Sequence, residues 1–255
     1  MPDEPPPARP FPLSAAQVTG PVTEHPLIPA ATVVLLRDTV DGIEALMMRR
    51  NSKLEFAGGM WVFPGGRVDP ADHDGGEVSE EPELVLAAAR RAAVREALEE
   101  AGLVVDPSSL VPFSHWTPPG ITPKRFSTWF FAAPAPGGEV VIDGGEIHDH
   151  AWLAPTDALR RRNALEIELA PPTWITLETL ARHATTAAAL DAFGAVAPER
   201  FATRFAVVGE DVVAMYDGDA GYEDEEPARD GGRHRLVMAK AGWRYERDGY
   251  PSALV

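Results

Sequence analysis

The chain has 255 residues, of which 45% are hydrophobic and 24% charged, enough to bury the core of one domain with appendages or of two small domains. It contains no cysteine, which excludes disulfides and thiol catalysis, and no apolar run approaching the ~18 residues of a transmembrane helix. The formal net charge of −16 argues against a nucleic-acid partner, because binding a phosphate backbone requires a basic surface.

The N-terminal segment is expected to be a flexible arm. Residues 1–12 contain six prolines and few apolar side chains that could pack. A segment of this composition does not bury enough apolar surface to fold by itself. It also lacks the basic and apolar regions of a secretory signal, so the expectation is a cytoplasmic protein. We place this arm at residues 1–29.

Short strands are predicted directly after the arm. Residues 31–37 predict a buried strand, and Asp41-Gly42 predicts the turn that leads to a hairpin partner at residues 43–49. Residues 61–63 predict a further short strand that ends in Pro64-Gly65-Gly66. Two glycines in succession let the backbone turn tightly and approach a ligand.

A long helix is predicted for residues 83–101, which are rich in Ala, Leu, Glu and Arg and follow a first-turn proline, Pro82. Gly102 suits the left-handed position that ends a helix. At about 100° per residue, the second half of this helix has an apolar side and an acidic side. The apolar side carries Val94, Ala97, Leu98 and Ala101, and the acidic side carries Glu96, Glu99 and Glu100.

The three carboxylates are the first indication of chemistry. Glutamates one turn apart repel one another, so helix formation alone gives no reason to gather them. A hard divalent cation gives a reason, because Mg²⁺ takes oxygen ligands and shares them with substrate phosphates. A merely solvated acidic face is the alternative explanation for the helix considered by itself.

The rest of the chain predicts further strands and helices around this helix. Strands are expected at residues 125–133 and 151–153, and helices at 155–162 and 174–183. In the C-terminal third, strands are expected at 205–208, 212–216 and 235–239. His148-Asp149-His150 has metal-binding residue types, but a zinc site is disfavoured because no cysteine or third nearby histidine accompanies them.

The arrangement of Gly66 and residues 95–103 resembles the Nudix box, Gly-x5-Glu-x7-Arg-Glu-U-x-Glu-Glu-x-Gly-U, in which U is a bulky aliphatic residue. The resemblance implies a Nudix fold of the α+β class, an α-β-α sandwich with a mixed central β-sheet flanked by helices. It also implies a Mg²⁺- or Mn²⁺-dependent hydrolase that cleaves a pyrophosphate linkage. The residues that match the box are Gly66, Arg95, Glu96, Glu99, Glu100, Gly102 and Leu103.

The resemblance also implies roles for these residues. Glu96, Glu99, Glu100 and the carbonyl of Gly66 would bind the metal, and Arg95 would orient the metal-binding glutamates. Glu146 lies six residues before Trp152 and resembles the loop glutamate that serves in many family members as a metal ligand or proton acceptor. Glu96 and Glu146 are therefore both candidates for the general base.

One departure from the box concerns its first half. Gly66 and Arg95 are 29 residues apart, 15 more than the 14 of the standard box. The position of the first box glutamate is occupied by Ala87, so that carboxylate is either missing or supplied by the insertion. Candidates for supplying it are Glu80, Glu81 and Glu83. We expect the acidic insertion, at about residues 70–82, to be a solvated, mobile loop and not a second metal site.

Substrate choice depends on further resemblances. Gly59-x3-Phe63-Pro64-Gly65-Gly66 resembles the end of the coenzyme A-pyrophosphatase signature, and Arg49 occupies its first arginine position, whereas Glu55 replaces its second arginine. The inserted box and the segments 123–131, 143–153 and 171–177 resemble the peroxisomal CoA-diphosphatase branch of mammals. CoA or acyl-CoA is the expected substrate, with 3′,5′-ADP and a 4′-phosphopantetheine as products.

Two alternatives remain open: a pyrophosphatase for ADP-ribose or another nucleoside diphosphate-linked compound, and a non-catalytic Nudix-fold binding module. The expected partner is a small nucleoside diphosphate-linked substrate, with no nucleic acid and no membrane, and the sequence allows a homodimer. We expect a Nudix domain at residues 30–185 and a C-terminal extension at 186–255 packing on it. Four basic residues are expected to bind the substrate phosphates: Arg49, Arg50, Lys124 and Arg125. Three tryptophans are candidates for stacking on a substrate base: Trp116, Trp129 and Trp174.

Overall fold

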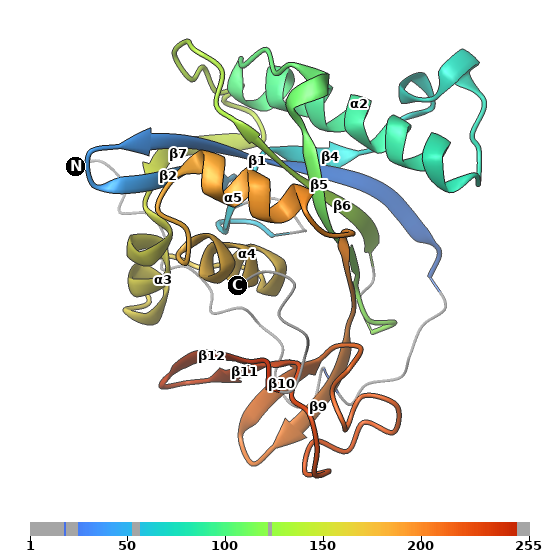
Figure 1. Cartoon of the computed structure of the whole chain (residues 1–255), viewed down its shortest axis with the longest axis vertical. Coiled ribbons are helices and arrows are strands. Elements are labelled where there is room, and N and C mark those ends of the chain that lie inside the picture. Colours follow the sequence, from blue (N-terminus) through green and yellow to red (C-terminus); the bar gives the residue numbers. More distant parts are fainter. Residues whose placement is uncertain (1–17, 19–24, 53–56, 122–123, 249–255) are drawn as a thin grey trace.

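A computed structural model describes residue 18 and residues 25–52, 57–121 and 124–248 (Figure 1). Within these residues, eight strands form a mixed sheet. They are β1 (Leu27–Thr39), β2 (Gly42–Arg50), β3 (Trp61–Val62), β4 (Gly65–Arg67), β5 (Val111–Thr117), β6 (Arg125–Pro134), β7 (Ile147–Leu153) and β8 (Glu199–Ala202). The main order is β3-β2-β1-β6-β5-β8, with β4 paired to β1 and β7 to β2. This is the predicted mixed central sheet.

Strand β1 organises the sheet. It pairs antiparallel with β4 near its start and with β2 near its end, and it pairs parallel with β6 along most of its length. Because successive side chains of a strand point to opposite faces, Ala31, Val33 and Leu35 enter one core, whereas Val34 and Leu36 enter another. The sheet is therefore covered on both faces.

Helix α2 (Pro82–Ala101) covers the first face. Pro82 begins it and Gly102 ends it with a left-handed φ of 67°, as predicted. Alanines form its buried side, which lets the helix lie close to the sheet: Ala88, Ala89, Ala92, Ala93, Ala97 and Ala101. The predicted separation into an apolar and an acidic side is wrong at two positions, because Leu98 is exposed and Glu100 is buried.

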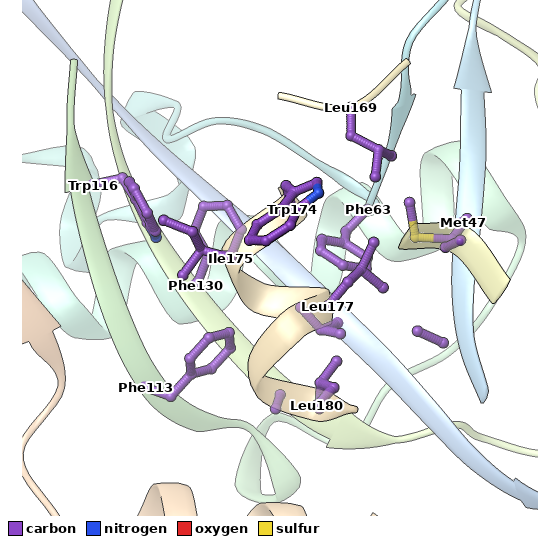
Figure 2. Packing of buried hydrophobic residues seen from close by; sticks show 14 of the residues in the cluster. Met47, Phe63, Phe113, Trp116, Phe130, Leu169, Trp174, Ile175, Leu177 and Leu180 are labelled. Carbon is purple, nitrogen blue, oxygen red and sulfur yellow. The ribbon is translucent and has the colours of Figure 1, made fainter. Parts of the chain in front are cut away.

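Three helices cover the second face: α3 (Pro155–Asn163), α4 (Pro171–Leu180) and α5 (Thr186–Gly194). Figure 2 shows how side chains of α4 meet those of the sheet, with Trp174 and Leu177 beside Phe63 and Phe130. Figure 1 places this layer and α2 on opposite sides of the sheet. The α-β-α layering expected from the sequence is confirmed.

A second sheet lies beyond these helices and was not predicted as a separate layer. Within the described residues it is antiparallel, in the order β12-β11-β10-β9. Its strands are β9 (Arg204–Val208), β10 (Asp211–Met215), β11 (Arg235–Ala239) and β12 (Gly242–Glu246). It shares a core with the second face of the main sheet, and the Arg162 guanidinium of α3 lies 4.0 Å from the ring centre of Trp243 in β12.

Several elements differ from the sequence prediction. Strands β4, β5, β8 and β12 and helix α5 were not predicted, and β7 begins four residues earlier than expected. Strand β1 begins at Leu27, within the segment expected to be an arm, most of which lies outside the described residues. Every helix in the described part of the chain is too short or too polar to span a bilayer.

Candidate active site

The last turns of α2 lie against β4, so the carboxylates of the helix meet the two glycines of the strand. The backbone N–H of Gly65 donates to Oε2 of Glu100 at 3.0 Å. A side chain at Gly66 would collide with the carboxylate of Glu96, because an ideal Cβ there lies far inside van der Waals distance of it. A Cβ at Gly65 would instead meet the backbone of β1 at Ala31 and Thr32, so Gly65 lets β4 approach β1, whereas Gly66 leaves room for the Glu96 carboxylate of α2.

Burial changes the acidity of two of the three glutamates. Glu100 is only 6% exposed, and desolvation raises its pKa to about 7, although the Gly65 N–H and the nearby Arg50 oppose the shift. Desolvation also raises the pKa of Glu96, against the effect of Arg95. Glu99 is different, since 58% of its side chain is exposed. The site therefore combines a buried carboxylate, which lies 3.9 Å from the guanidinium of Arg50, with an accessible one.

Arg95 holds two of these glutamates. Its Nη1 donates to Oε1 of Glu96 at 2.7 Å and to Oε2 of Glu99 at 3.3 Å, and its Nη2 donates to the carbonyl oxygen of Arg67 in β4 at 2.8 Å. Hydrogen bonding to Asp72, followed by that to Glu96, raises the pKa of Arg95 above its ordinary value. The i,i+4 pair between Arg95 and Glu99 therefore belongs to a larger network.

The insertion in the box is exposed to solvent along most of its length, as the sequence suggested, but Asp72 is an exception. It forms two short turns at Pro70–Asp72 and Asp74–Gly76, and Asp72 is only 5% exposed. Its carboxylate accepts from Nε of Arg95 at 3.2 Å and from Nη2 at 2.9 Å. The expectation failed at Asp72 because a buried carboxylate in a loop is stable when a guanidinium pairs with it.

Glu146 lies in the loop before β7 and faces the same site. Its Oε2 is 3.0 Å from Nη2 of Arg50, whose Nη1 is 3.9 Å from Oε1 of Glu100. Asp143 shapes the loop, because its carboxylate accepts backbone N–H donations from residues 145–147. The N–H of Asn51 donates to the carbonyl oxygen of Glu146 at 2.7 Å. The loop is thus held at both its backbone and its side chain.

The four basic residues predicted to meet phosphates lie apart. Arg50 adjoins Glu100 and Glu146, whereas Arg49 lies on β2 at the register of Trp61. Arg125 donates to the carbonyl oxygens of His25 and Pro118, at the far end of β6. Ala31 of β1 pairs with Gly66 on one side and with Trp129 of β6 on the other. Arg125 lies four residues before Trp129, so it is about 13 Å along β6 from the level of Gly66. Lys124 is exposed just before β6.

Two of the three tryptophans considered for base stacking belong to the core. Trp116 is buried and stacks on Phe201 at 3.9 Å between ring centres, and Trp174 is buried in the layer shown in Figure 2. A substrate base cannot reach either ring without opening the core, so that expectation is wrong for both. Trp129 is partly exposed beside His115. His148 and Asp149 are exposed on β7.

The donor set fits a hard divalent ion. Glu96, Glu99 and Glu100 offer carboxylate oxygens, and Gly66 offers a backbone carbonyl, which are ligands that Mg²⁺ prefers. As arranged, no three His, Asp or Glu side chains of the described residues are gathered closely enough to hold an ion. Arg95 and the Gly65 N–H bind these carboxylates instead, and burial raises the pKa of Glu100. The residues therefore fit the metal that the box implies.

Sequence reasoning missed the supporting residues Asp72, Asp143 and Asn51. Asp69-Pro70-Ala71-Asp72 does carry a local signal, because an acid three residues after a capping residue with proline between them is typical of a turn start. In the structure, the N–H of Asp69 donates to Oδ2 of Asp72 at 2.8 Å. That signal predicts the turn but not the long-range contact with Arg95.

Comparison with known proteins identifies one matching family and several similar solved structures. The NUDIX domain family matches residues 26–174. The chain is similar to the NUDIX hydrolase from Alicyclobacillus acidocaldarius, with 23% identity and a TM-score of 0.59 over 66% of this chain and 97% of that one. At this identity the likeness concerns the fold.

Two further structures are more distant. The MutT NUDIX hydrolase from Burkholderia pseudomallei has 23% identity and a TM-score of 0.43 over 60% of this chain and 98% of that one. The NUDIX domain of Shewanella oneidensis NrtR, solved in complex with ADP ribose, has 16% identity and a TM-score of 0.45 over 62% and 88%. No curated protein matches the chain.

Proposed function

The chain belongs to the NUDIX domain family as a pyrophosphohydrolase, and from this premise we propose that it cleaves the diphosphate of a nucleoside diphosphate-linked compound. The observation that carries the proposal is that Glu96 and Glu100 both meet the glycines of β4, while Arg95 links Glu96 to the exposed Glu99. Carboxylates that are one turn apart and partly desolvated are poorly suited to a structural role. They suit a site that holds divalent cations against phosphate oxygens.

We assign the binding of Mg²⁺ or Mn²⁺ to Glu96, Glu99, Glu100 and the Gly66 carbonyl. A bound divalent ion would supply activation of water and neutralisation of charge on the diphosphate. The protein's own contribution is positioning: Arg95 fixes Glu96 and Glu99, and the Gly65 N–H fixes Glu100. These contacts prepare the oxygens before a substrate arrives, which reduces the reorganisation needed at reaction.

The general base is either Glu96 or Glu146. Glu96 is desolvated and held by Arg95, whereas 60% of the Glu146 side chain is exposed and its Oε2 is bound by Arg50. The position of Arg50 between Glu100 and Glu146 supports a role in aligning these carboxylates besides the predicted contact with phosphate. Arg49, Lys124 and Arg125 remain candidates for binding the outer parts of the substrate.

For the substrate, we propose CoA or acyl-CoA, with ADP-ribose as the alternative. The support for CoA is the sequence pattern from Gly59 to Gly66, with Arg49 in its first arginine position; Glu55, at the second, lies outside the described residues. CoA places a further demand on the site, because its 3′-phosphate needs a cationic partner if it is desolvated. We further propose that residues 30–185 are the catalytic domain and that 186–255 pack on it through β8 and Trp243.

The test is a hydrolysis panel with the full chain. CoA, an acyl-CoA, dephospho-CoA, ADP-ribose and NADH are each incubated with Mg²⁺ or Mn²⁺, and products are separated by chromatography. Reaction in ¹⁸O-labelled water identifies the attacked phosphorus, and EDTA and Glu99→Gln serve as controls. We expect metal-dependent cleavage with CoA preferred over dephospho-CoA.

Three other outcomes would change the assignment. Equal cleavage of CoA and dephospho-CoA would remove the need for a 3′-phosphate site. A tenfold or greater kcat/KM preference for ADP-ribose, about 1.4 kcal/mol, would replace CoA by ADP-ribose. Binding of these ligands without any turnover would favour the non-catalytic module.

A further inference from the structure

Asp72 is a buried acid in an insertion whose other acidic side chains are exposed. Asp69, Asp74, Glu77, Glu80 and Glu81 are all exposed, and 76% of the Asp74 side chain is accessible. Isolating a carboxylate from water is unfavourable unless charged or polar donors satisfy it. The burial of Asp72 therefore directs attention to the donors that surround it.

These donors occupy both oxygens of Asp72. Oδ1 accepts from Nε of Arg95, and Oδ2 accepts from Nη2 of Arg95 and from the N–H of Asp69. This side-on pair of bonds from guanidinium to carboxylate fixes orientation as well as distance. An oxygen pair engaged in this way faces Arg95, which favours a role as the partner of that guanidinium over one as a metal ligand.

Helix α2 itself holds Asp72 in position. Nε of Arg91, one turn before Arg95, donates to the backbone carbonyl of Asp72, and Nη2 of Arg91 lies 3.1 Å from Oδ1 of Asp74. Pro70 stiffens the turn that presents Asp72. Two arginines of the helix thus hold the insertion, Arg91 through the backbone carbonyl of Asp72 and Arg95 through its buried carboxylate, whereas the exposed pair of Arg91 with Asp74 contributes little.

The remaining part of the Arg95 guanidinium reaches the site. Nη1 contacts Glu96 and Glu99, the proposed metal ligands, while Nε and Nη2 contact Asp72. Without Asp72, the acidic neighbours of Arg95 would be these two glutamates and the more distant Asp69, whose Oδ2 lies 3.8 Å from Nη2. The guanidinium would lose the paired contact that fixes its plane, and its charge would compete more strongly with the metal for the oxygens of Glu96 and Glu99.

We propose that Asp72, acting through Arg95, is a positioning residue that holds Glu96 and Glu99 in the geometry required for metal-dependent hydrolysis. It takes the place of the carboxylate that the box lacks at Ala87, although it comes from the insertion and lies 15 residues earlier in the chain. The inference rests on the proposed function, because the role of Asp72 is defined through the hydrolytic site.

The test compares Asp72→Asn with the matched control Asp74→Asn, an exposed aspartate of the same insertion. For Asp72→Asn we expect kcat to fall about 10- to 100-fold with substrate KM changed less than about threefold, the usual effect of removing an outer partner of a metal site. For Asp74→Asn we expect nearly unchanged kcat. Asp72→Glu restores the charge and should recover part of the loss.

A double-mutant cycle with Arg95→Gln separates positioning from a general loss of stability. If Asp72 acts through Arg95, adding Asp72→Asn to Arg95→Gln causes little further loss of kcat. Mn²⁺ binding by calorimetry should keep its stoichiometry in Asp72→Asn while its affinity falls. If Asp72→Asn does not fold, Asp72→Glu is tested in the same cycle, and its effect on kcat should likewise vanish in Arg95→Gln.

Several results would overturn the inference. Equal kcat in wild type, Asp72→Asn and Asp74→Asn would remove any role for Asp72, and additive losses in the cycle would show that it does not act through Arg95. Loss of one Mn²⁺ per chain in Asp72→Asn, but not in Arg95→Gln, would make Asp72 a ligand. An inactive wild type across the whole substrate panel would reject the proposed function instead.

Discussion

The backbone N–H of Gly65 and the Glu100 carboxylate, 35 positions apart in the chain, meet in a 3.0 Å hydrogen bond that joins β4 to the end of α2. This bond leaves the other carboxylate oxygen of Glu100 directed toward Arg50, 3.9 Å away. A single buried side chain therefore closes the helix onto the strand and presents an oxygen to the site.

We expect Glu99→Gln and Glu100→Gln each to reduce kcat about a hundredfold or more, or ~2.7 kcal/mol, while the fold survives. In both variants the amide keeps the size of the side chain but loses the negative charge. In Glu100→Gln the amide oxygen can still accept the hydrogen bond from the Gly65 N–H. Turnover at saturating Mg²⁺ is the measurement. Glu83→Gln is the control, because it lies on the same helix about 24 Å away from Glu99; near wild-type turnover in either test variant would reject the metal assignment.

A methyl group at position 66 should be far more harmful than one at position 137. In Gly66→Ala the new Cβ meets the carboxylate of Glu96, whereas nothing lies within 4 Å of a Cβ at Gly137. We expect Gly66→Ala to lose at least tenfold in kcat and to weaken Mn²⁺ binding, and Gly137→Ala to leave both within twofold. Mn²⁺ affinity from a binding titration and kcat are measured for both variants. Equal Mn²⁺ affinity and equal kcat in the two variants would refute the close contact.

The exposed acids of the insertion should contribute little to turnover. The triple variant Glu77→Gln, Glu80→Gln and Glu81→Gln removes charges that the structure leaves in solvent. We expect kcat within about twofold of wild type. If the whole insertion were only a solvated loop, deletion of residues 72–80 would leave kcat unchanged. We expect this deletion to lower kcat, because it removes Asp72. A large loss in the triple variant would mean that one of these glutamates supplies the missing carboxylate.

Stability should fall in mild acid because of His234 in the C-terminal sheet. Burial lowers the pKa of His234 to about 4, while its Nδ1 lies 2.6 Å from the carbonyl oxygen of Asp217. The unfolded chain binds this proton near pH 6.5, so the contribution is fully present above pH 6.5 and is lost as the pH falls toward 4. Between pH 7 and 5 we expect the free energy of unfolding to fall by about 1–2 kcal/mol from this group.

Urea unfolding at the two pH values measures this loss. His234→Gln should show a smaller difference between pH 7 and 5 than wild type, and the exposed His148→Gln should show the wild-type difference. If His234→Gln retained the full difference, other groups would be responsible for the acid sensitivity.

The sequence predicted well those elements whose signals are local. Helix α2 is set by Pro82, an alanine-rich interior and Gly102, and the hairpin of β1 and β2 is set by Asp41-Gly42 and alternating apolar residues. Strand β5 escaped prediction because Val111–Thr117 mixes proline, serine and histidine with its apolar residues. It becomes a strand through its pairing with β6 and β8, which no local pattern encodes.

The site shows the same limit. Residue types and spacing indicated Glu96, Glu99 and Glu100 as a group, and the structure brings Glu96 and Glu100 to β4 and links Glu99 to Glu96 through Arg95. The burial of Glu100 was not predictable, because helical periodicity placed it among the solvated positions. Asp72 was missed for a related reason. Its contact with Arg95, 23 residues later, depends on how the insertion folds back onto α2, and the acidic composition of the insertion predicted only exposed side chains.

The pairing of β5 with β8 has a consequence for synthesis on the ribosome. Ser114 of β5 pairs with Glu199 of β8, so the partner of β5 at this edge of the main sheet is synthesised 85 residues later. Contacts between such distant segments form slowly, and an unpaired strand edge invites association with other chains. During translation, β5 therefore has an unpaired edge until β8 has been made, and in this interval the partly made chain is open to association with other chains.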